Sequence, residues 1–261
     1  MDDGAPHPAP LELSALTWLE ARAALSPGAV VLLPVGAIEA HGPHLPLDTD
    51  VVIATEAARR AAVLLTATGR PVVIAPAVVY GVSYVGTCFP GTLPAPADAV
   101  TALVASVLAA LADAGPRRLA VVNAHLEPAH VAAVAAGVAR AAAATSAGIA
   151  FPDKREDRWA ATLSAEFRQG ARHAGAYETS LMLAARPGAV RRDLLPDLAP
   201  VWVDLPARLR AGARTFAEAG GVDGYFGDPA AASAAEGERL FAALARMIAT
   251  AVAELSTPGV T

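Results

Sequence analysis

The chain has 261 residues, a formal net charge of −5 and a single cysteine, Cys88. A chain of this length can bury a core without covalent staples, and one cysteine excludes an intramolecular disulfide, which suits the reducing cytoplasm that we expect as its location. The acidic balance, without a dense run of lysine and arginine, argues against nucleic acid or an anionic membrane surface as a partner.

The sequence predicts neither a signal peptide nor a membrane-spanning segment. The first ten residues carry acids where a signal peptide has basic residues, so residues 1–10 are interpreted as a short mobile leader. The longest apolar stretch, residues 99–112, is shorter than the roughly 20 residues that a membrane span needs, and it predicts a buried helix. No fixed-period repeat and no long linker divide the sequence, so we expect a single domain over residues 1–261.

Strand-like and helix-like segments alternate along the first 150 residues. Apolar, valine-rich runs predict buried strands at residues 29–35, 71–80, 118–123 and 148–151. Longer alanine-rich segments predict helices at residues 51–65, 96–114 and 128–145. This alternation predicts an α/β fold with a mainly parallel sheet covered on both faces, in which ligands bind at the carboxyl ends of the strands.

The later part of the chain is less regular. Residues 153–172 are polar and mixed, and they are interpreted as a helix or a flap over the site. Residues 177–185, 204–218 and 230–255 have helical character, with glycine-rich loops between the last two segments.

The first cluster of chemical groups follows the first predicted strand. Glu39 and His41 are two residues apart, so in an extended segment both side chains face the same side, as metal ligation requires. Asp48 and Asp50 follow on a loop that Pro43 and Pro46 stiffen. An aspartate at this place can also cap the helix that begins near Val51, and we assign that role to Asp48 and metal binding to Asp50.

A second pair with the same spacing, His125 and Glu127, follows the third predicted strand. Two imidazoles and three carboxylates give mixed nitrogen and oxygen ligation for two divalent ions, with Zn and Mn as the first candidates and Fe as a third. Five of the six histidines lie in these motif regions, which surface histidines would not do by chance: His41, His44, His125, His130 and His173. His130 is the weakest of them, and we expect it to cover the helix surface.

Two further segments carry candidate groups. His173 can act as a general acid or base, and Glu178 is either a ligand, a group that positions one, or a residue that suits the start of its helix. Ser83, after the second predicted strand, is either a hydrogen-bond partner of the substrate or an ordinary loop serine.

Four motifs resemble those of the creatininase family and occur in the same order along the chain. The longest is PVGAIEAHGPHLPLDTD at residues 34–50, and it is followed by FPGT at 89–92, NAHLE at 123–127 and HAGAYETS at 173–180. The resemblance implies a three-layer α/β/α sandwich, a homo-oligomer with six copies, and two metal ions bridged by Asp50. Glu39 and His125 would complete one site, His41 and Glu127 the other, and His173 would transfer the proton. Ser83 matches a substrate-contacting serine.

Departures from the family pattern bear on the substrate. Most relatives carry NGHGGN where this chain has NAHLEP, and in those relatives a glutamate at the place of Glu178 can take the role assigned here to Glu127. Gln169 or a neighbour occupies the region where creatininase has a tryptophan, and we name Trp159 as a replacement for that aromatic surface and Leu126 as a further substrate contact.

The expected function is therefore hydrolysis of a C–N bond in a small or cyclic amide by a hydroxide that two metal ions activate. A peptidase that trims a small modified peptide is the first alternative, because residues 224–241 resemble mycofactocin-type members of the family. A metal-binding homologue without catalysis is the second alternative. The expected partner is a small molecule or a short peptide.

Overall fold

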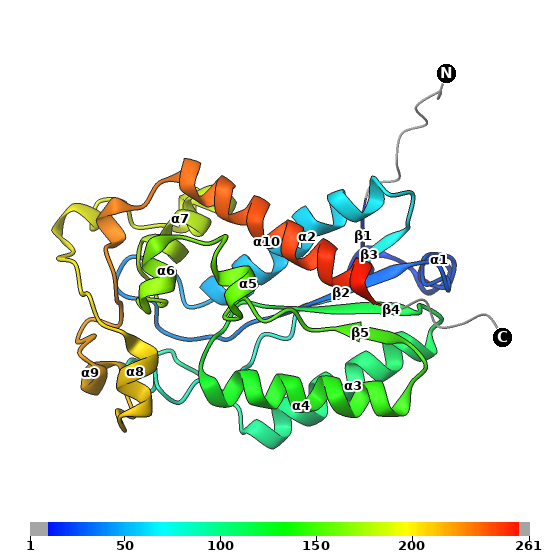
Figure 1. Ribbon diagram of the computed structural model, residues 1–261, viewed down its shortest axis with the longest axis horizontal. Helices are drawn as coiled ribbons and strands as arrows, with labels where there is room; N and C mark the ends of the chain where they lie inside the picture. Colours follow the sequence, from blue (N-terminus) through cyan, green and yellow to red (C-terminus); the bar gives the residue numbers. More distant parts are fainter. Residues whose placement is uncertain (1–9, 256–261) are drawn as a thin grey trace.

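The computed structural model of the protein describes residues 10–255, so the predicted leader lies outside the described residues except for Pro10 (Figure 1). All paired strands run parallel, in the order β1-β3-β2-β4-β5. The strands are β1 (Leu11–Glu12), β2 (Val30–Val35), β3 (Val72–Ile74), β4 (Arg118–Asn123) and β5 (Gly148–Ala150). The central pair, β2 and β4, is in register over the full length of both strands.

Helices cover both faces of this sheet. One face carries α2 (Thr49–Thr66), α7 (Ala176–Ala185) and α10 (Ala234–Glu254), and the other carries α3 (Ala97–Asp113) and α4 (Pro128–Ala144), as Figure 1 shows for α2 and α10 against α3 and α4. Alternate residues of β2 serve the two sides: Val30 and Leu32 pack in one cluster, and Val31 and Leu33 in the other. The predicted α/β/α sandwich with a parallel sheet is confirmed.

Two predicted elements are shorter than expected, for reasons of backbone chemistry. The strand predicted at residues 71–80 pairs only over Val72–Ile74. Pro76 has no N–H to donate, and beyond it only an isolated bridge joins Val78 to Val35. The last helix begins at Ala234 instead of residue 230, since Ser233 accepts a hydrogen bond from the backbone N–H of Glu236 and caps it.

The helix predicted at residues 204–218 is two short helices, α8 (Leu205–Arg210) and α9 (Phe216–Ala219). Gly212, at φ 105°, lies between them in a conformation that continues neither helix. The segment predicted as a helix or flap, residues 153–172, holds α5 (Asp157–Ala160) and α6 (Ala165–Gln169). Two elements, α1 (Trp18–Ala24) and β1, were not predicted from the sequence.

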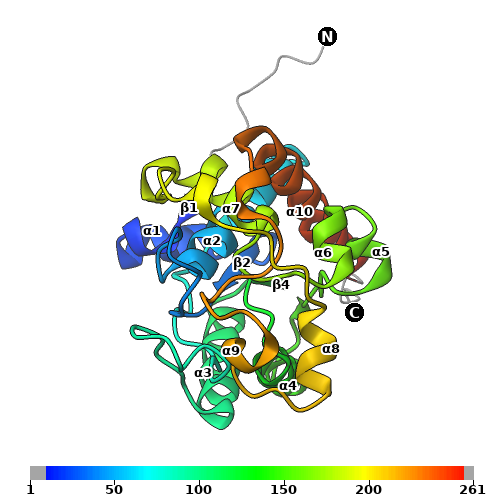
Figure 2. The same ribbon diagram turned by 90° about the vertical axis from the view of Figure 1, so that its left-hand side faces the viewer.

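The loops after β2 and β4 and the start of α7 meet at one edge of the molecule. Figure 2 looks at the molecule from this end, where α6, α8 and α9 surround the start of α2 and the ends of β2 and β4. In a parallel sheet this is the edge at which ligands bind. Within residues 10–255, no helix combines the length and the apolar character that a bilayer crossing requires.

Candidate metal centre

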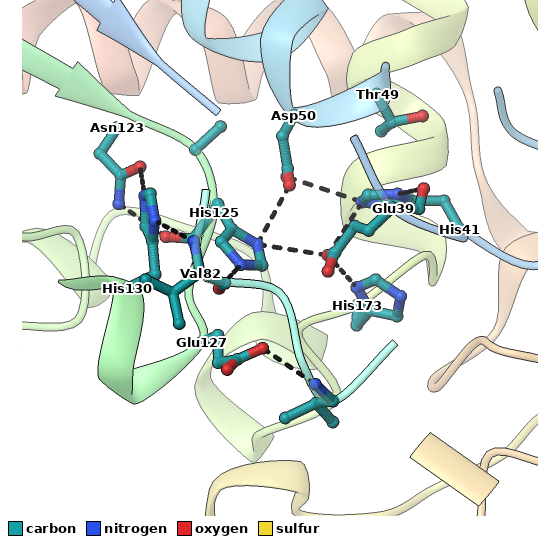
Figure 3. Close-up of polar contacts among 12 residues, drawn as sticks. Glu39, His41, Thr49, Asp50, Val82, Asn123, His125, Glu127, His130 and His173 are labelled. Carbon is teal, nitrogen blue, oxygen red and sulfur yellow. Dashed lines mark hydrogen bonds and ion pairs between the residues drawn. The ribbon is translucent and has the colours of Figure 1, made fainter. Parts of the chain in front are cut away.

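Side chains from four separate segments meet at this edge (Figure 3). Glu39 and His41 follow β2, Asp50 lies in the first turn of α2, and His125 follows β4. Glu178 lies in the first turn of α7. All five side chains are buried. The fold therefore concentrates three carboxyl groups and two imidazoles in a place that excludes water, and such a set needs compensating positive charge.

Distances divide these residues into two groups that have Asp50 in common. The Nδ1 atom of His125 lies 3.2 Å from Glu39 Oε1 and 3.1 Å from Asp50 Oδ2. On the other side, His41 Nε2 lies 3.6 Å from Asp50 Oδ1 and 3.6 Å from Glu178 Oε2. Each group offers two carboxylates and one imidazole within the span of a single ion. Asp50 thus presents one oxygen to each group, as a carboxylate between two cations does.

The outer hydrogen bonds of the two imidazoles fix which nitrogen faces the carboxylates. His125 donates from Nε2 to the carbonyl oxygen of Val82 at 2.8 Å, and His41 donates from Nδ1 to the carbonyl oxygen of Glu39 at 3.1 Å. A neutral ring has only one N–H, so in their neutral form these rings carry lone pairs on the inward nitrogens, His125 Nδ1 and His41 Nε2. Lone pairs that face carboxylate oxygens are the arrangement of metal ligands.

Unsatisfied atoms point to the same conclusion. Among the described residues, Glu39 Oε2, His41 Nε2 and Asp50 Oδ2 are buried without a hydrogen-bond partner. Buried polar atoms of native proteins are almost always satisfied. The residues present therefore fit two divalent cations, whose coordination would satisfy these atoms.

Electrostatics show how strongly the cluster attracts positive charge. Although burial opposes it, the negative charges of Asp50 and Glu178 raise the pKa of His41 to about 10. Burial also lowers the pKa of His125, but the negative charges of Glu39 and Asp50 outweigh this effect and hold it well above its usual value. Burial raises the pKa of Glu178 to about 7. A cluster that holds extra protons this firmly can exchange them for cations, because both compensate the same carboxylates.

His173 lies beside this candidate metal cluster and, together with Glu39, Asp50, His125 and Glu178, lines a cavity that opens from it. Its Nε2 donates to the carbonyl oxygen of Ala40 at 2.9 Å, while Nδ1 lies 3.6 Å from Glu39 Oε1. The ring packs between His41 and Phe216, with centroid distances of 4.5 and 4.1 Å. Burial and the positive charge of His41 lower the pKa of His173 to about 4. A neutral ring with a free Nδ1 lone pair can accept a proton during a reaction.

The two candidates for the second site, Glu127 and Glu178, occupy different positions. Glu178 approaches His41 as described, whereas Glu127 accepts a hydrogen bond at Oε2 from the backbone N–H of Val85 at 3.1 Å. Glu127 lines the cavity but belongs to none of the ligand groups found among residues 10–255. The geometry favours Glu178 as the ligand, and Glu127 as a residue that holds the loop at Val85.

This assignment predicts different metal contents for two matched variants. Glu178→Gln removes a charged ligand of the second group, so we expect the bound metal to fall from two equivalents to about one. Glu127→Gln removes a charge of the same kind, and we expect two equivalents to remain. Elemental analysis after gel filtration measures both, and the reverse pattern would make Glu127 the ligand.

The predicted substrate-contacting residues differ in where they lie relative to the cavity. Leu126 lines the cavity, and the buried Ser83 hydroxyl has no hydrogen-bond partner among the described residues. Trp159 does not line the cavity; it packs against the core with the Arg158 guanidinium 4.1 Å from its ring. The aromatic surface in the cavity is Phe216, which the sequence reading did not single out. The sequence offered one signal for it: Phe216 is the only aromatic residue in the segment 204–218.

Two expectations about the motif residues are wrong. His130 is fully buried, not on the surface: its Nε2 donates to Asn123 Oδ1, and its Nδ1 accepts from the N–H of Val82. It thus holds Val82, the residue whose carbonyl oxygen orients His125. Asp48 stands at the N-cap of α2, but its side chain makes no cap hydrogen bond, because Arg186 binds it with both terminal nitrogens.

Two buried charged residues that the sequence reading passed over support the centre. The Lys154 ammonium donates to the carbonyl oxygen of Ala124, next to His125, at 3.1 Å. Glu166 accepts hydrogen bonds from the backbone N–H groups of Ala176, Tyr177 and Asp228. Glu166 therefore ties the first turn of α7 to the loop that follows α9.

A cavity of about 640 Å³ opens from the metal cluster. Glu39, Asp50, His125 and Glu178 lie in its wall together with His173. Its other walls come from the chain segments around α5, α6, α8 and α9, and they include Asp153, Arg155, Arg172, Leu205, Leu209, Arg210 and Phe216. The arrangement places a cavity with room for a ligand directly against a set of carboxylates and imidazoles suited to divalent cations.

Comparison with known proteins places this site in a family. The family model described as creatinine amidohydrolase matches residues 14–252. The mycofactocin precursor peptide peptidase of Mycobacterium tuberculosis (strain ATCC 25618 / H37Rv) is 36% identical over 221 residues, covering 82% of this chain and 80% of the relative. The creatinine amidohydrolase of Pseudomonas putida is 32% identical over 205 residues, covering 71% of this chain and 75% of that protein.

Solved structures agree with this placement. The creatininase structure described as "Creatininase Mn" superposes with a TM-score of 0.73 at 27% identity, over 94% of this chain and 98% of that chain. A mutant creatininase described as Zn-Zn type gives a TM-score of 0.74 at 25% identity, over 94% and 98%. Family model, relatives and fold lead to one conclusion: this chain belongs to the creatininase family.

Proposed function

We propose that this chain, a hydrolase of carbon–nitrogen bonds, is a metal-dependent peptidase that cleaves a short precursor peptide of the mycofactocin type. The observation that carries the proposal is the cavity of about 640 Å³ that opens from the candidate metal cluster. A volume in this range accommodates a ligand far larger than a single heterocycle. The relatives at 36% identity are peptidases by name, which supports a peptide as the occupant.

Two divalent ions, Zn or Mn, would be held by the two groups that have Asp50 in common. Glu39 and His125 would complete one site, and His41 and Glu178 the other. Ions bound there would lower the pKa of a water molecule and polarise the carbonyl of the scissile bond. Val82 and the backbone of Glu39 keep the two imidazoles in the tautomers that binding needs.

The remaining tasks belong to side chains of the chain itself. His173 would accept at Nδ1 a proton from the attacking water and give it to the departing amine nitrogen, which would otherwise leave as a strongly basic anion. Its Nε2 hydrogen bond to Ala40 and its stacking on Phe216 hold the ring in place. Leu126 lines the cavity beside the cluster and is positioned to contact the substrate. Ser83 is fully buried and is not part of the cavity wall, so it takes no substrate contact in this proposal.

A small cyclic amide is the second candidate, favoured by the creatinine amidohydrolase relatives. The Trp159 ring predicted to hold a flat substrate is absent from the cavity wall, and a molecule the size of creatinine would leave most of the space to water. Binding a small ring tightly requires close walls, because ligand sites usually enclose most of the ligand surface. The cavity therefore favours the peptide.

A substrate comparison tests the proposal. Protein reconstituted with Mn²⁺ or Zn²⁺ is incubated with a mycofactocin-type precursor peptide, with creatinine and with formamides, and the products are identified by mass spectrometry. We expect cleavage at one peptide bond, loss of activity with a chelator and recovery when metal is added back. Turnover of creatinine without any peptide cleavage would contradict the proposal and favour the small amide.

A further inference from the structure

Three arginines gather in the part of the cavity wall that faces the metal cluster from the covering segments. Arg155 precedes α5, Arg172 follows α6 and directly precedes His173, and Arg210 ends α8. In Figure 2, α5 and α6 lie on the right of the view and α8 lies below them. Segments distant in sequence therefore bring three positive charges into the one cavity that contains the candidate catalytic groups.

The carboxylates in this part of the cavity wall do not neutralise all three arginines. Asp153 is bound by Arg155, whose Nε and terminal nitrogen contact both of its oxygens. Glu156, the other acid of this wall, pairs with Arg158 at 3.2 Å. Asp204 lies near Arg172 but accepts the backbone N–H of Ala207 as the cap of α8. Among the described residues, no carboxylate lies within ion-pair distance of Arg172 or Arg210.

Arg172 is held in place for binding. Its Nε donates to the carbonyl oxygen of Phe167 at 2.8 Å, and its guanidinium lies 4.7 Å from the centre of the Phe167 ring. These contacts use one N–H and one face, so the terminal nitrogens remain free for a planar anion. Burial and the charge of Arg155 lower the pKa of Arg172, although Asp204 and Asp153 act against this shift.

We propose that Arg172 and Arg210 form a subsite for a carboxylate of the peptide substrate, which positions the scissile bond at the metal cluster. The inference rests on the proposed function and adds a substrate class to it: a peptide with a negative charge close to the cleaved bond. A carboxylate matches the guanidinium fork and would supply the missing counter-charge. It comes either from the chain end of the peptide or from an aspartate or glutamate side chain.

Binding of paired peptides tests the subsite independently of turnover. The protein is the metal-loaded His173→Ala variant, and the probes are acetyl-Gly-Val-Gly as free acid and as amide, and acetyl-Gly-Glu-Gly-amide against acetyl-Gly-Gln-Gly-amide. Titration calorimetry should show about a tenfold preference for the acid in one of the two pairs, as expected for a charge-assisted hydrogen bond. The pair that shows the preference identifies the source of the carboxylate.

Two further variants separate the arginines from the metals, which also attract carboxylates. Adding Arg172→Gln and Arg210→Gln together should reduce the preference to about one, while Arg210→Gln alone, at an exposed position, should reduce it in part. Arg214→Gln, on the same segment but outside the cavity wall, should leave it unchanged. Equal binding of acid and neutral peptides, or a preference that survives the double change, would overturn the inference.

The two proposals can fail separately. If the acid peptides bind with the expected arginine dependence but wild-type holoenzyme cleaves no peptide, the peptidase function is wrong and the carboxylate subsite stands. If wild-type holoenzyme cleaves acid and neutral peptides with equal kcat/KM, the subsite is wrong and the peptidase function stands.

Discussion

Replacing Asp50 by asparagine is expected to abolish metal loading and to reduce turnover by at least about a thousandfold, the equivalent of roughly 4 kcal/mol of transition-state stabilisation. Asp50 is the residue common to both ligand groups, with Oδ1 at 3.6 Å from His41 Nε2 and Oδ2 at 3.1 Å from His125 Nδ1. An amide supplies one neutral oxygen and an NH₂ group, so it cannot serve two cations. Elemental analysis and peptide turnover on the same preparation measure both effects.

The control lies two residues earlier. Asp48→Asn removes a carboxylate of the same kind from the same turn, but that carboxylate is partly exposed and pairs with Arg186. A partly exposed ion pair contributes at most about 1 kcal/mol, so we expect a slightly lower unfolding temperature, two equivalents of metal and an unchanged rate. Asp50→Asn protein that keeps its metal and its full rate would exclude Asp50 as the shared ligand.

Much of the fold was predictable because its signals are local. The runs at residues 29–35 and 118–123 are apolar throughout, as expected of strands covered on both faces, and both became central strands of the sheet. Because ligands bind where parallel strands end, the sequence alone predicts that Glu39, His41 and His125 lie in one region. The i, i+2 spacing of Glu39 and His41 allowed both to face the same point.

What the sequence left open depends on contacts between distant segments. Glu178 lies far along the chain from His41, and only the packing of α7 against α2 brings its Oε2 within 3.6 Å of His41 Nε2. Glu127, by contrast, had the right spacing from His125, yet its side chain turns to the N–H of Val85. Spacing shows which residues can face one point, but the tertiary partner decides which of them does.

The predictions for His130 and Trp159 were wrong for the same reason. A histidine in the first turn of an alanine-rich helix resembles a surface residue, and only the approach of the loop at Val82 buries it. An aromatic residue in a polar segment resembles a substrate platform, but α5 directs Trp159 toward the core while Phe216, from a segment without a site motif, lines the cavity. The covering segments contain none of the metal motifs, so these motifs indicated the metal ligands better than the substrate contacts.

Replacing His173 by alanine is expected to leave two equivalents of metal in place and to lower kcat by roughly 10²–10⁴-fold. The two ligand groups that have Asp50 in common do not include His173, so their coordination survives the change. What the variant loses is the Nδ1 atom that carries a proton to the departing nitrogen. Metal analysis and steady-state kinetics with the cleaved peptide measure the two expectations separately.

The leaving group provides a readout that a merely structural role of His173 would not produce. An ordinary peptide amine is strongly basic and needs a proton as it departs, whereas p-nitroaniline is weakly basic and departs with little assistance. We therefore expect His173→Ala to lose far less rate on a p-nitroanilide than on the matched peptide, with metal content equal for both assays. Phe216→Leu keeps the imidazole and removes the ring stacked on it, so its loss should be small and similar for the two substrates. Equal losses on both substrates in His173→Ala would mean that the imidazole shapes the cavity and does not transfer the proton. The proton would then have to come from another group in the cavity wall. Glu127 is the first candidate for that role, because it lines the cavity and burial raises its pKa.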